Sequence, residues 1–420
     1  MNQAVPPRKI AVIGAGIVGV STALLLQRDG HQVTLLDPTP PGCGTSFGNA
    51  GSIAIGGVYP TSSPGNWKQV PKMLMDPITP LSLKPGHLLR NLPFFLRFLA
   101  EGRAGRVEEI SIHLSEILKG ATDAHRKLLE LSRAQEIVRP VGWLKVYSSQ
   151  ASFDKTAQER AVMARRGINF DILSPDEIRQ LEPGLSPKFT HGYHQPDNGF
   201  VSQPIKLTEA YFAKFQELGG SWLPEKVRGF ELGPNGVEKV KTTHATHSVD
   251  SVVIAAGAFS HRLLEMLDLR ILFDTERGYH LNLNVTAGPE LRRPTVIGDQ
   301  GFVLAPMQDG LRLTTGAEFA GLDAPPDFSR IKAMLPMARE ALPGLEFEID
   351  REWLGFRPST PDSVPVVARL SKPMNVFANF GHGHLGLTMA ARTGEMIADM
   401  VAERHSAIDL APYRLERVQR

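Results

Sequence analysis

A glycine-rich run near the start of the chain, Gly14-Ala15-Gly16-Ile17-Val18-Gly19, constrains the fold more than any other feature of the sequence. It separates an apolar segment, residues 9–13, from the helical spacing of residues 17–28. The first glycine permits a tight turn, the second lets the backbone approach a pyrophosphate, and the third lets the helix pack closely on the strand. Unpaired N–H groups at a helix start also favour phosphate. The run predicts a dinucleotide site made by Gly14, Gly16, Ile17, Val18 and Gly19.

Asp37 ends the next predicted strand, residues 31–37, and Gly30 stands where a glycine closes the preceding helix. Two strands joined by a helix pair in parallel. An acid at the end of the second strand can accept hydrogen bonds from ribose hydroxyls and disfavours a 2′-phosphate. The whole unit is typical of a Rossmann-type domain.

Two later segments bear on the choice between FAD and NAD, which the glycine run alone leaves open. Residues 252–258 predict a buried strand that runs into small residues, Ala256 and Gly257, where backbone can come close to a ligand. Residues 379–386 place three glycines before the final predicted helix, residues 385–403. The positive end of that helix could stabilise the negative charge of a reduced flavin ring.

The bulk composition excludes several other classes of function. The chain has 420 residues, which predicts two domains, and its 46 basic and 44 acidic residues give no reason to expect a nucleic-acid partner. Its one cysteine, Cys43, excludes a disulfide within the chain and a cysteine zinc site, and we expect no metal. No stretch of 18 apolar residues and no signal-peptide pattern occur, so a cytoplasmic location is expected.

Further elements follow from hydrophobic periodicity. Residues 38–85 are rich in glycine, proline, serine and threonine and predict a long irregular segment. Helical patterns run over residues 107–132. Later strands are expected at residues 142–147, 251–255, 280–285, 301–306 and 311–316.

Together these segments resemble the D-amino-acid oxidase superfamily, and most closely the bacterial FAD-dependent D-amino-acid dehydrogenases of the small-subunit type. Residues 12–26 match the family's Rossmann start, and residues 44–53 match its flavin-facing loop. Arg277-Gly278-Tyr279-His280 and the signature at residues 355–365, followed by Gly-His-Gly-His-Leu-Gly, match the later motifs. Val227 resembles the valine that faces the adenine side.

The resemblance implies an α/β fold in which a Rossmann-type FAD-binding domain carries an inserted α+β substrate domain with a mixed sheet. The FAD-binding domain would comprise residues 1–85, 197–270 and 350–420, and the substrate domain residues 86–196 and 271–349. The implied reaction is oxidative deamination of a D-amino acid, or oxidation of a D-imino acid such as a D-proline derivative. A hydride passes to the flavin, and the electrons then pass to an acceptor other than oxygen, such as a quinone.

Such a reaction needs protein groups that orient the substrate, because the cofactor carries the oxidation. Arg357 is the best candidate for a carboxylate clamp, since a guanidinium binds a carboxylate through two parallel hydrogen bonds. Tyr279 could add a further bond, and His280 could touch flavin or substrate. By resemblance, the remaining flavin contacts are Ser46, Asn49, Ala50, Gly51, Ala256, Gly257, Gly381, His382, Gly383, His384, Leu385 and Gly386.

The sequence departs from the pattern of related dehydrogenases in two places. His384 stands where they usually carry threonine, and Cys43 precedes the flavin loop. The cysteine linkage of the sarcosine-oxidase relatives therefore has no partner at the C-terminal end, and noncovalent FAD is expected. Two alternatives stay open: a glycine- or sarcosine-type amine oxidase on the same scaffold, and a non-catalytic FAD-binding subunit.

Residues 88–99 combine apolar bulk with Arg90 and Arg97, which suits a segment lying at a membrane surface. This predicts a possible peripheral contact with the inner face of the membrane, through Phe95 and Phe98 among others. Packing inside the substrate domain is the alternative. Pro93 is expected to kink the helix or to start a new one.

Overall fold

The computed structural model describes residues 6–62 and 81–420, and its N-terminal part is the predicted strand-helix-strand unit. Strand β1 (Lys9–Ile13) leads through α1 (Ile17–Arg28) to β2 (Gln32–Leu36), and the two strands are parallel. Alternate residues of β1 enter different cores, with Ile10 and Val12 on one face and Ala11 and Ile13 on the other. A strand buried on both faces explains the continuous apolar run.

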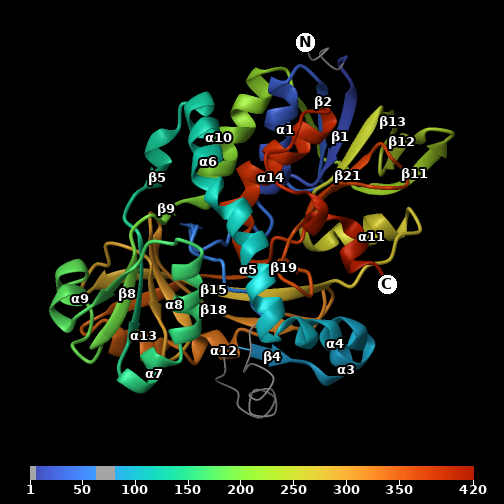
Figure 1. Ribbon diagram of the computed structural model, residues 1–420. Coiled ribbons are helices and arrows are strands. Elements are labelled where there is room, and N and C mark those ends of the chain that lie inside the picture. The colour runs from blue at the N-terminus through green and yellow to red at the C-terminus, as the bar shows by residue number, and fades with distance from the viewer. Residues whose placement is uncertain (1–5, 63–80) are drawn as a thin grey trace.

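The first sheet has six strands in the order β10-β2-β1-β14-β21-β20. All its neighbours are parallel except β20 and β21. Helices α1, α10 and α14 cover one face, and a small antiparallel sheet, β11-β12-β13, packs on the other (Figure 1). Its remaining elements are β10 (Ser221–Leu223), β14 (Ser251–Ile254), β20 (Val366–Arg369), β21 (Val376–Phe380), α10 (Pro204–Glu217), α11 (Ser260–Glu265), α14 (Gly386–Val401), β11 (Val227–Gly233), β12 (Gly236–Thr242) and β13 (Thr246–Ser248).

The second large sheet has nine strands in the order β19-β15-β18-β17-β16-β6-β8-β7, with β4 paired to β18. It is mixed, as expected, because β16 with β6 and β18 with β4 are parallel pairs. Its strands are β4 (Leu81–Leu83), β6 (Trp143–Tyr147), β7 (Asp171–Leu173), β8 (His191–Gln195), β15 (Asp274–Ala287), β16 (Thr295–Ile297), β17 (Phe302–Met307), β18 (Gly310–Phe319) and β19 (Glu346–Ser359).

Helices and a second small sheet, in the order β3-β9-β5, make up the rest of the described fold. Figure 1 shows α5 between the upper part, which holds the six-stranded sheet, and the lower part, which holds the nine-stranded one. The helical region predicted at residues 107–132 is two helices that meet at Gly120, α5 (Ala104–Lys119) and α6 (Ala121–Ser132). The other elements are β3 (Ser52–Ile53), β5 (Val138–Arg139), β9 (Gly199–Val201), α3 (Pro85–Arg90), α4 (Leu92–Glu101), α7 (Gln150–Asp154), α8 (Ala157–Arg165), α9 (Pro175–Leu181), α12 (Ser329–Lys332) and α13 (Leu335–Ala341).

Two sequence expectations concern the bounds of elements. The boundary expected between residues 349 and 350 falls inside β19, which pairs with β15 along its whole length, so the large sheet continues to Ser359. Pro93 starts a new helix, since it stands in the first turn of α4. The aromatic residues of α4 point inward, where Phe94 and Phe95 pack on Phe319.

Candidate cofactor and substrate site

The predicted phosphate-binding turn has the geometry that its glycines require. Gly14 has φ +110°, and a Cβ there or at Gly19 would overlap backbone atoms of Ala255 or Gly14. The first turn of α1 carries no acid, and its N-cap residue, Gly16, has no side chain to cap it. Ser46 lies at this end, because its Oγ accepts a hydrogen bond of 2.9 Å from the Ile17 N–H. The N-terminus of α1 is therefore suited to an anion.

The other predicted cofactor segments meet at the same edge of the six-stranded sheet. Strands β1, β2, β14 and β21 run parallel, so the residues after their carboxyl ends gather there. These are the glycine run, Asp37, the Ala256-Gly257 pair and the segment from Gly381 onward. Asp37 Oδ2 accepts a 2.8 Å hydrogen bond from the Ala15 N–H, which ties the acid to the turn. Val227 is buried on the neighbouring strand β11.

Open space lies beside these segments, and this is what a dinucleotide needs. A Cβ added at Gly257 or Gly383 would meet no atom within 4 Å, although both residues follow fully buried strands. Backbone at this edge can therefore be approached by a ligand. The residues present thus fit FAD: an acid-free helix start for phosphate, Asp37 for ribose and open glycine backbone beside them.

The flavin loop predicted from the sequence is anchored to the nine-stranded sheet. Arg312 on β18 donates hydrogen bonds to the Asn49 carbonyl at 2.7 Å and the Phe47 carbonyl at 3.3 Å. His280 Nδ1 donates to the Gly48 carbonyl at 3.3 Å. Within the loop, the Asn49 side chain accepts from the Gly51 N–H at 2.8 Å. Sequence reasoning missed Arg312, because a lone arginine in a strand gives no signal of the loop that it holds.

His280 is itself buried and uncharged. Its ring stacks on Trp353 with 4.8 Å between centroids. Burial, with a smaller effect of the Arg312 charge, lowers the pKa of His280 to about 3. The structure therefore places His280 as a neutral support of the loop, beside the predicted flavin position.

One face of the β15–β19 pair carries a row of polar and aromatic side chains interrupted by two glycines. In register, His280 faces Trp353, Gly278 faces Gly355, and Glu276 faces Arg357. A Cβ at Gly278 would overlap the Arg357 guanidinium, and one at Gly355 would overlap the Trp353 ring. The two long side chains therefore lie across the glycines, and Gly278 sets where the guanidinium of Arg357 rests.

Arg357 is half-buried and lacks an acidic partner at ion-pair distance in the described parts of the chain. Its Nη1 donates to the Gly316 carbonyl at 2.8 Å, and this is its one hydrogen bond to the described residues. Glu276 faces Arg357 from β15 without forming an ion pair with it, so a ligand carboxylate could still pair directly with this partly desolvated guanidinium. The rest of the guanidinium fork has no hydrogen bond to the described residues, which suits the predicted carboxylate clamp.

Glu276 and His384 form a second feature of this face, and sequence reasoning missed the acid. His384, in the short turn Gly383–Leu385, donates from Nε2 to Glu276 Oε2 at 2.6 Å. His382 lies apart from this pair. It is buried with its Nε2 on Thr393 Oγ1 at 3.1 Å, and burial lowers its pKa to about 3.

Tyr279 and Arg277 point to the opposite face of β15, because successive side chains of a strand alternate. The Tyr279 hydroxyl donates to Glu318 at 2.6 Å, and its ring packs edge-on against Phe328. Arg277 is fully buried and pairs with the same Glu318 at 3.2 Å. This placement favours a structural contact for Tyr279 over the predicted bond to substrate.

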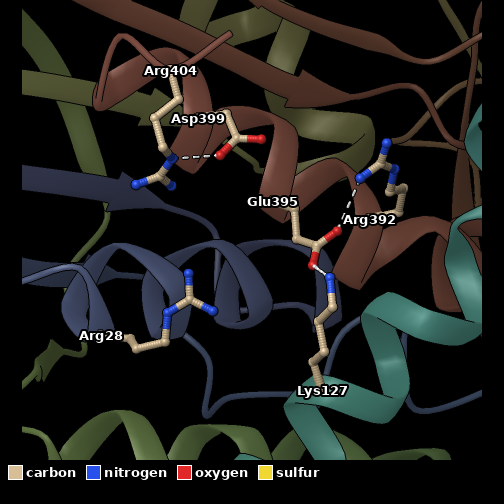
Figure 2. A pocket seen from close by; sticks show the side chains of 6 residues that line it. All are labelled: Arg28, Lys127, Arg392, Glu395, Asp399 and Arg404. Carbon is tan, nitrogen blue, oxygen red and sulfur yellow. Dashed lines mark hydrogen bonds and ion pairs between the residues drawn. The ribbon is translucent and has the colours of Figure 1, made fainter. Parts of the chain in front are cut away.

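A polar hollow of about 300 Å³ elsewhere on the surface is a poor alternative site. Figure 2 shows its lining of charged side chains from α1, α6 and α14. Glu395 holds Lys127 and Arg392, while Asp399 holds Arg404. Arg28 pairs with Asp29, so each of the four cations that line the hollow already has an acidic partner in the protein. No cluster of metal-ligating side chains occurs within residues 6–62 and 81–420.

Comparison with known proteins identifies the family. Residues 9–400 match the family described as FAD dependent oxidoreductase. The chain belongs to this family. A D-amino-acid oxidase of Bradyrhizobium diazoefficiens is 34% identical over 414 residues, 97% of this chain and 98% of the relative. A D-amino acid dehydrogenase of Sinorhizobium medicae is 28% identical over 419 residues, 97% and 99% of the two chains.

Solved structures agree on the fold of this FAD-dependent oxidoreductase. Glycine oxidase from Geobacillus kaustophilus matches with a TM-score of 0.74 at 21% identity, over 98% of this chain and 99% of that one. L-proline dehydrogenase from P. horikoshii matches with 0.75 at 19% identity, over 98% of both chains. The expected fold class and FAD are thereby confirmed. Among the described helices, none is long and apolar enough to cross a membrane.

Proposed function

We propose that this oxidoreductase oxidises a D-amino acid or a D-imino acid to the 2-oxo acid or cyclic imine, with electrons passed to an acceptor other than oxygen. The observation that carries the proposal is Arg357, a half-buried guanidinium with no acidic partner among the described residues. It lies on the sheet that holds the flavin loop. The names of two relatives, a D-amino-acid oxidase and a D-amino acid dehydrogenase, support the substrate class.

The residues of the site bind and orient the substrate. FAD, when bound, accepts the hydride from the substrate α-carbon. Arg357 would hold the carboxylate in two hydrogen bonds, and the absence of a side chain at Gly278 gives the guanidinium its place. Arg312 and His280 would keep the flavin loop fixed on the sheet. Fixed donors of this kind favour catalysis because they need no rearrangement when the substrate arrives.

We further propose that the six-stranded sheet and its helices form the FAD-binding domain and that the nine-stranded sheet forms the substrate domain. The cofactor contacts are those predicted from the sequence, with Tyr279 left out of the substrate site. Cys43 is exposed and precedes the loop, which supports noncovalent FAD. Denaturation in acid should therefore release the yellow colour into the supernatant, whereas flavin that stays with the precipitated chain would contradict this.

Anaerobic bleaching of the yellow protein tests the reaction. A panel of D-amino acids, D-proline, the matching L-amino acids, glycine and sarcosine should bleach the flavin with D-amino or D-imino acids only. Bleaching by glycine or sarcosine alone would favour the amine-oxidase alternative. No bleaching by any amine would favour a non-catalytic FAD-binding subunit. Turnover with oxygen compared with a quinone analogue then separates oxidase from dehydrogenase, and we expect the quinone analogue to be reduced faster.

A row of exposed leucines supports a peripheral membrane contact. Leu89 on α3 is 73% exposed, and Leu92, Leu96 and Leu99, which their spacing places on one side of α4, are 41, 59 and 45% exposed. Figure 1 shows α3 and α4 at the periphery of the lower part of the molecule. Arg90 and Arg103 beside them have no ion pair within residues 6–62 and 81–420. Apolar side chains flanked by free cations suit an anionic lipid surface. We therefore expect these leucines to contact the membrane, and not Phe95 and Phe98, which pack against the protein.

Flotation with anionic liposomes tests this contact. The parent should float at low salt, and a variant with Leu92→Ser and Leu96→Ser should stay in the dense fraction with its FAD retained. Leu232→Ser is the matched control, because Leu232 is 62% exposed on the distant strand β11. A parent that does not float, or a double variant that floats equally well, would contradict the proposal.

A further inference from the structure

The inference concerns His384, which a buried acid holds in a fixed orientation. Glu276 is only 4% exposed, and both of its oxygens are engaged. Oε2 accepts from His384 Nε2 at 2.6 Å, and Oε1 accepts from Ser359 Oγ at 2.7 Å. The His384 side chain is 42% exposed, so it is the accessible member of the group. A carboxylate buried behind an accessible imidazole orients that imidazole.

The Glu276 carboxyl is ionised. Burial by itself would raise its pKa, but the charge of an imidazolium at His384, the hydrogen bonds from His384 and the Ser359 hydroxyl, and the Arg357 charge outweigh this and lower the pKa to about 2. A carboxylate can only accept, so Nε2 of His384 carries the proton of their hydrogen bond. In a neutral imidazole, the form that can act as a base, the other ring nitrogen Nδ1 is an acceptor, and in His384 it has no hydrogen bond to the described residues.

The remaining charged and titratable groups nearby are accounted for. Arg357 extends from β19 opposite Glu276. His382 bonds to Thr393 and is neutral. Asp274, two residues before Glu276, is paired with His87 at 2.8 Å. Among these groups, His384 is the one that combines exposure with a free acceptor nitrogen.

An amino acid reaches the site as an ammonium, and its nitrogen needs a free electron pair before the α-hydrogen can leave as hydride. Arg357 and His384 both flank Glu276, and in an amino acid the nitrogen is attached to the carbon next to the carboxylate. A substrate clamped by Arg357 therefore has its nitrogen in the neighbourhood of His384. Once the proton moves, Arg357 balances the substrate carboxylate and protonated His384 balances Glu276, so no charge is left uncompensated.

We propose that His384, oriented by Glu276, is a catalytic base that accepts the proton of the substrate ammonium. The nitrogen–hydrogen bond of the ammonium breaks, a bond from that hydrogen to His384 Nδ1 forms, and the electron pair stays on the substrate nitrogen. The two electrons of the oxidation leave with the α-hydrogen to FAD, so this inference rests on the proposed function. It gives a role to the residue at which the chain departs from the threonine of related dehydrogenases.

The test is the pH dependence of anaerobic flavin reduction at saturating D-alanine, or another substrate from the panel, between pH 6 and 10. General-base catalysis typically contributes about 100-fold or more. His384→Gln should reduce flavin about 100-fold more slowly than the parent at pH 7. It should approach the parent rate near pH 10, where the substrate arrives as the free amine. Glu276→Gln should show a smaller loss with the same recovery. His405→Gln, at an exposed histidine outside the site, should match the parent.

Two further measurements separate a base from a structural residue. Propionate, which has the carboxylate but no amine, should perturb the flavin absorbance with the same affinity in parent and His384→Gln. Added imidazole should restore part of the rate of His384→Ala at pH 7. A parent-like pH profile in His384→Gln, or a loss that persists equally at pH 10, would overturn the proposal. A parent that neither binds propionate nor is bleached by any amine would instead contradict the proposed function.

Discussion

Successive side chains of strand β15 point to opposite faces of the sheet, and the two faces have different surroundings. On one face Glu276 and His280 join Arg357 beside the flavin loop, and on the other Arg277 and Tyr279 close on Glu318. Arg357 is half-buried and has no ion pair in the described residues, although Glu276 faces it, whereas Arg277 is fully buried, ion-paired and bonded to the Ala324 and Pro325 carbonyls. An arginine without a direct ion pair can still receive an anionic ligand, whereas one already paired in the interior serves the fold.

The largest expected effect is a loss of stability when Arg277 is removed from the face of β15 that carries Tyr279. Arg277→Ala removes the buried cation beside Glu318 and leaves that carboxylate with the Tyr279 hydroxyl and the more exposed Lys84 at 3.8 Å, and breaking a buried pair typically costs about 3–5 kcal/mol of unfolding free energy. Urea unfolding followed by FAD fluorescence measures it. Arg262→Ala is the control, because Arg262 pairs with the highly exposed Asp323 at the surface and should change stability little. An Arg277→Ala protein as stable as the parent would remove the structural role.

On the other face, Arg357→Ala should weaken substrate binding and leave folding intact. A hydrogen bond to a charged group contributes about 1.5–3 kcal/mol, so apparent substrate affinity should fall roughly 10- to 150-fold. Arg357→Lys should recover only part, because an ammonium cannot form the fork. Steady-state kinetics with FAD content as control measures this, and unchanged kcat/KM in Arg357→Ala would take Arg357 out of the site.

His280 predicts a pH dependence of stability on the cofactor face. Its folded-state pKa of about 3 lies below the ordinary value of 6.5. The unfolded chain therefore binds the proton first, and stability is lost as pH falls from 6.5 toward 3. Between pH 7.5 and 5.5 the loss from this group is about 1.4 kcal/mol. The amide of Asn in His280→Asn can replace the Nδ1 donor. In this variant, the loss of unfolding free energy between pH 7.5 and 5.5, measured by urea unfolding, should be smaller by that amount. An equal loss in both proteins would contradict it.

Gly278 tests whether the position of Arg357 matters. A methyl group in Gly278→Ala would displace the guanidinium, and we expect KM to rise about 3- to 10-fold, on the order of 1 kcal/mol, with FAD retained. Gly229→Ala is the matched control, since a Cβ there meets nothing within 4 Å. Equal KM in parent and Gly278→Ala would show that the guanidinium finds another productive position.

The smallest catalytic effect is expected at Tyr279. Because its hydroxyl faces Glu318, Tyr279→Phe should leave kcat/KM within about 2-fold while lowering stability by about 1 kcal/mol, the net value of one buried hydrogen bond. Stopped-flow reduction and urea unfolding of the same preparation measure both. A large loss of kcat/KM with unchanged stability would return Tyr279 to the substrate site.

Local chemistry determined much of this protein from the sequence. The turn at residues 14–19 needs glycine for steric reasons. Buried strands and helices show the periodicity of their apolar residues in the sequence. The Rossmann unit and the ends of β14 and β21 were therefore predictable. The role of Arg357 as a carboxylate clamp stays a prediction, made from its motif and from the chemistry of the guanidinium. The extent of β19 was not, since nothing within its sequence shows that β15 pairs with it as far as Ser359.

Only the tertiary structure decided which side chains share a face. The pairing register brings Glu276 opposite Arg357 and turns Tyr279 away, and a shift by one residue would exchange these outcomes. The meeting of Glu276 with His384 joins residues 108 positions apart, and the hold of Arg312 on the flavin loop spans more than 260 positions. Sequence patterns report local sterics and burial, whereas such partnerships depend on how distant segments pack, and this is why the acid behind His384 became visible only in the folded chain.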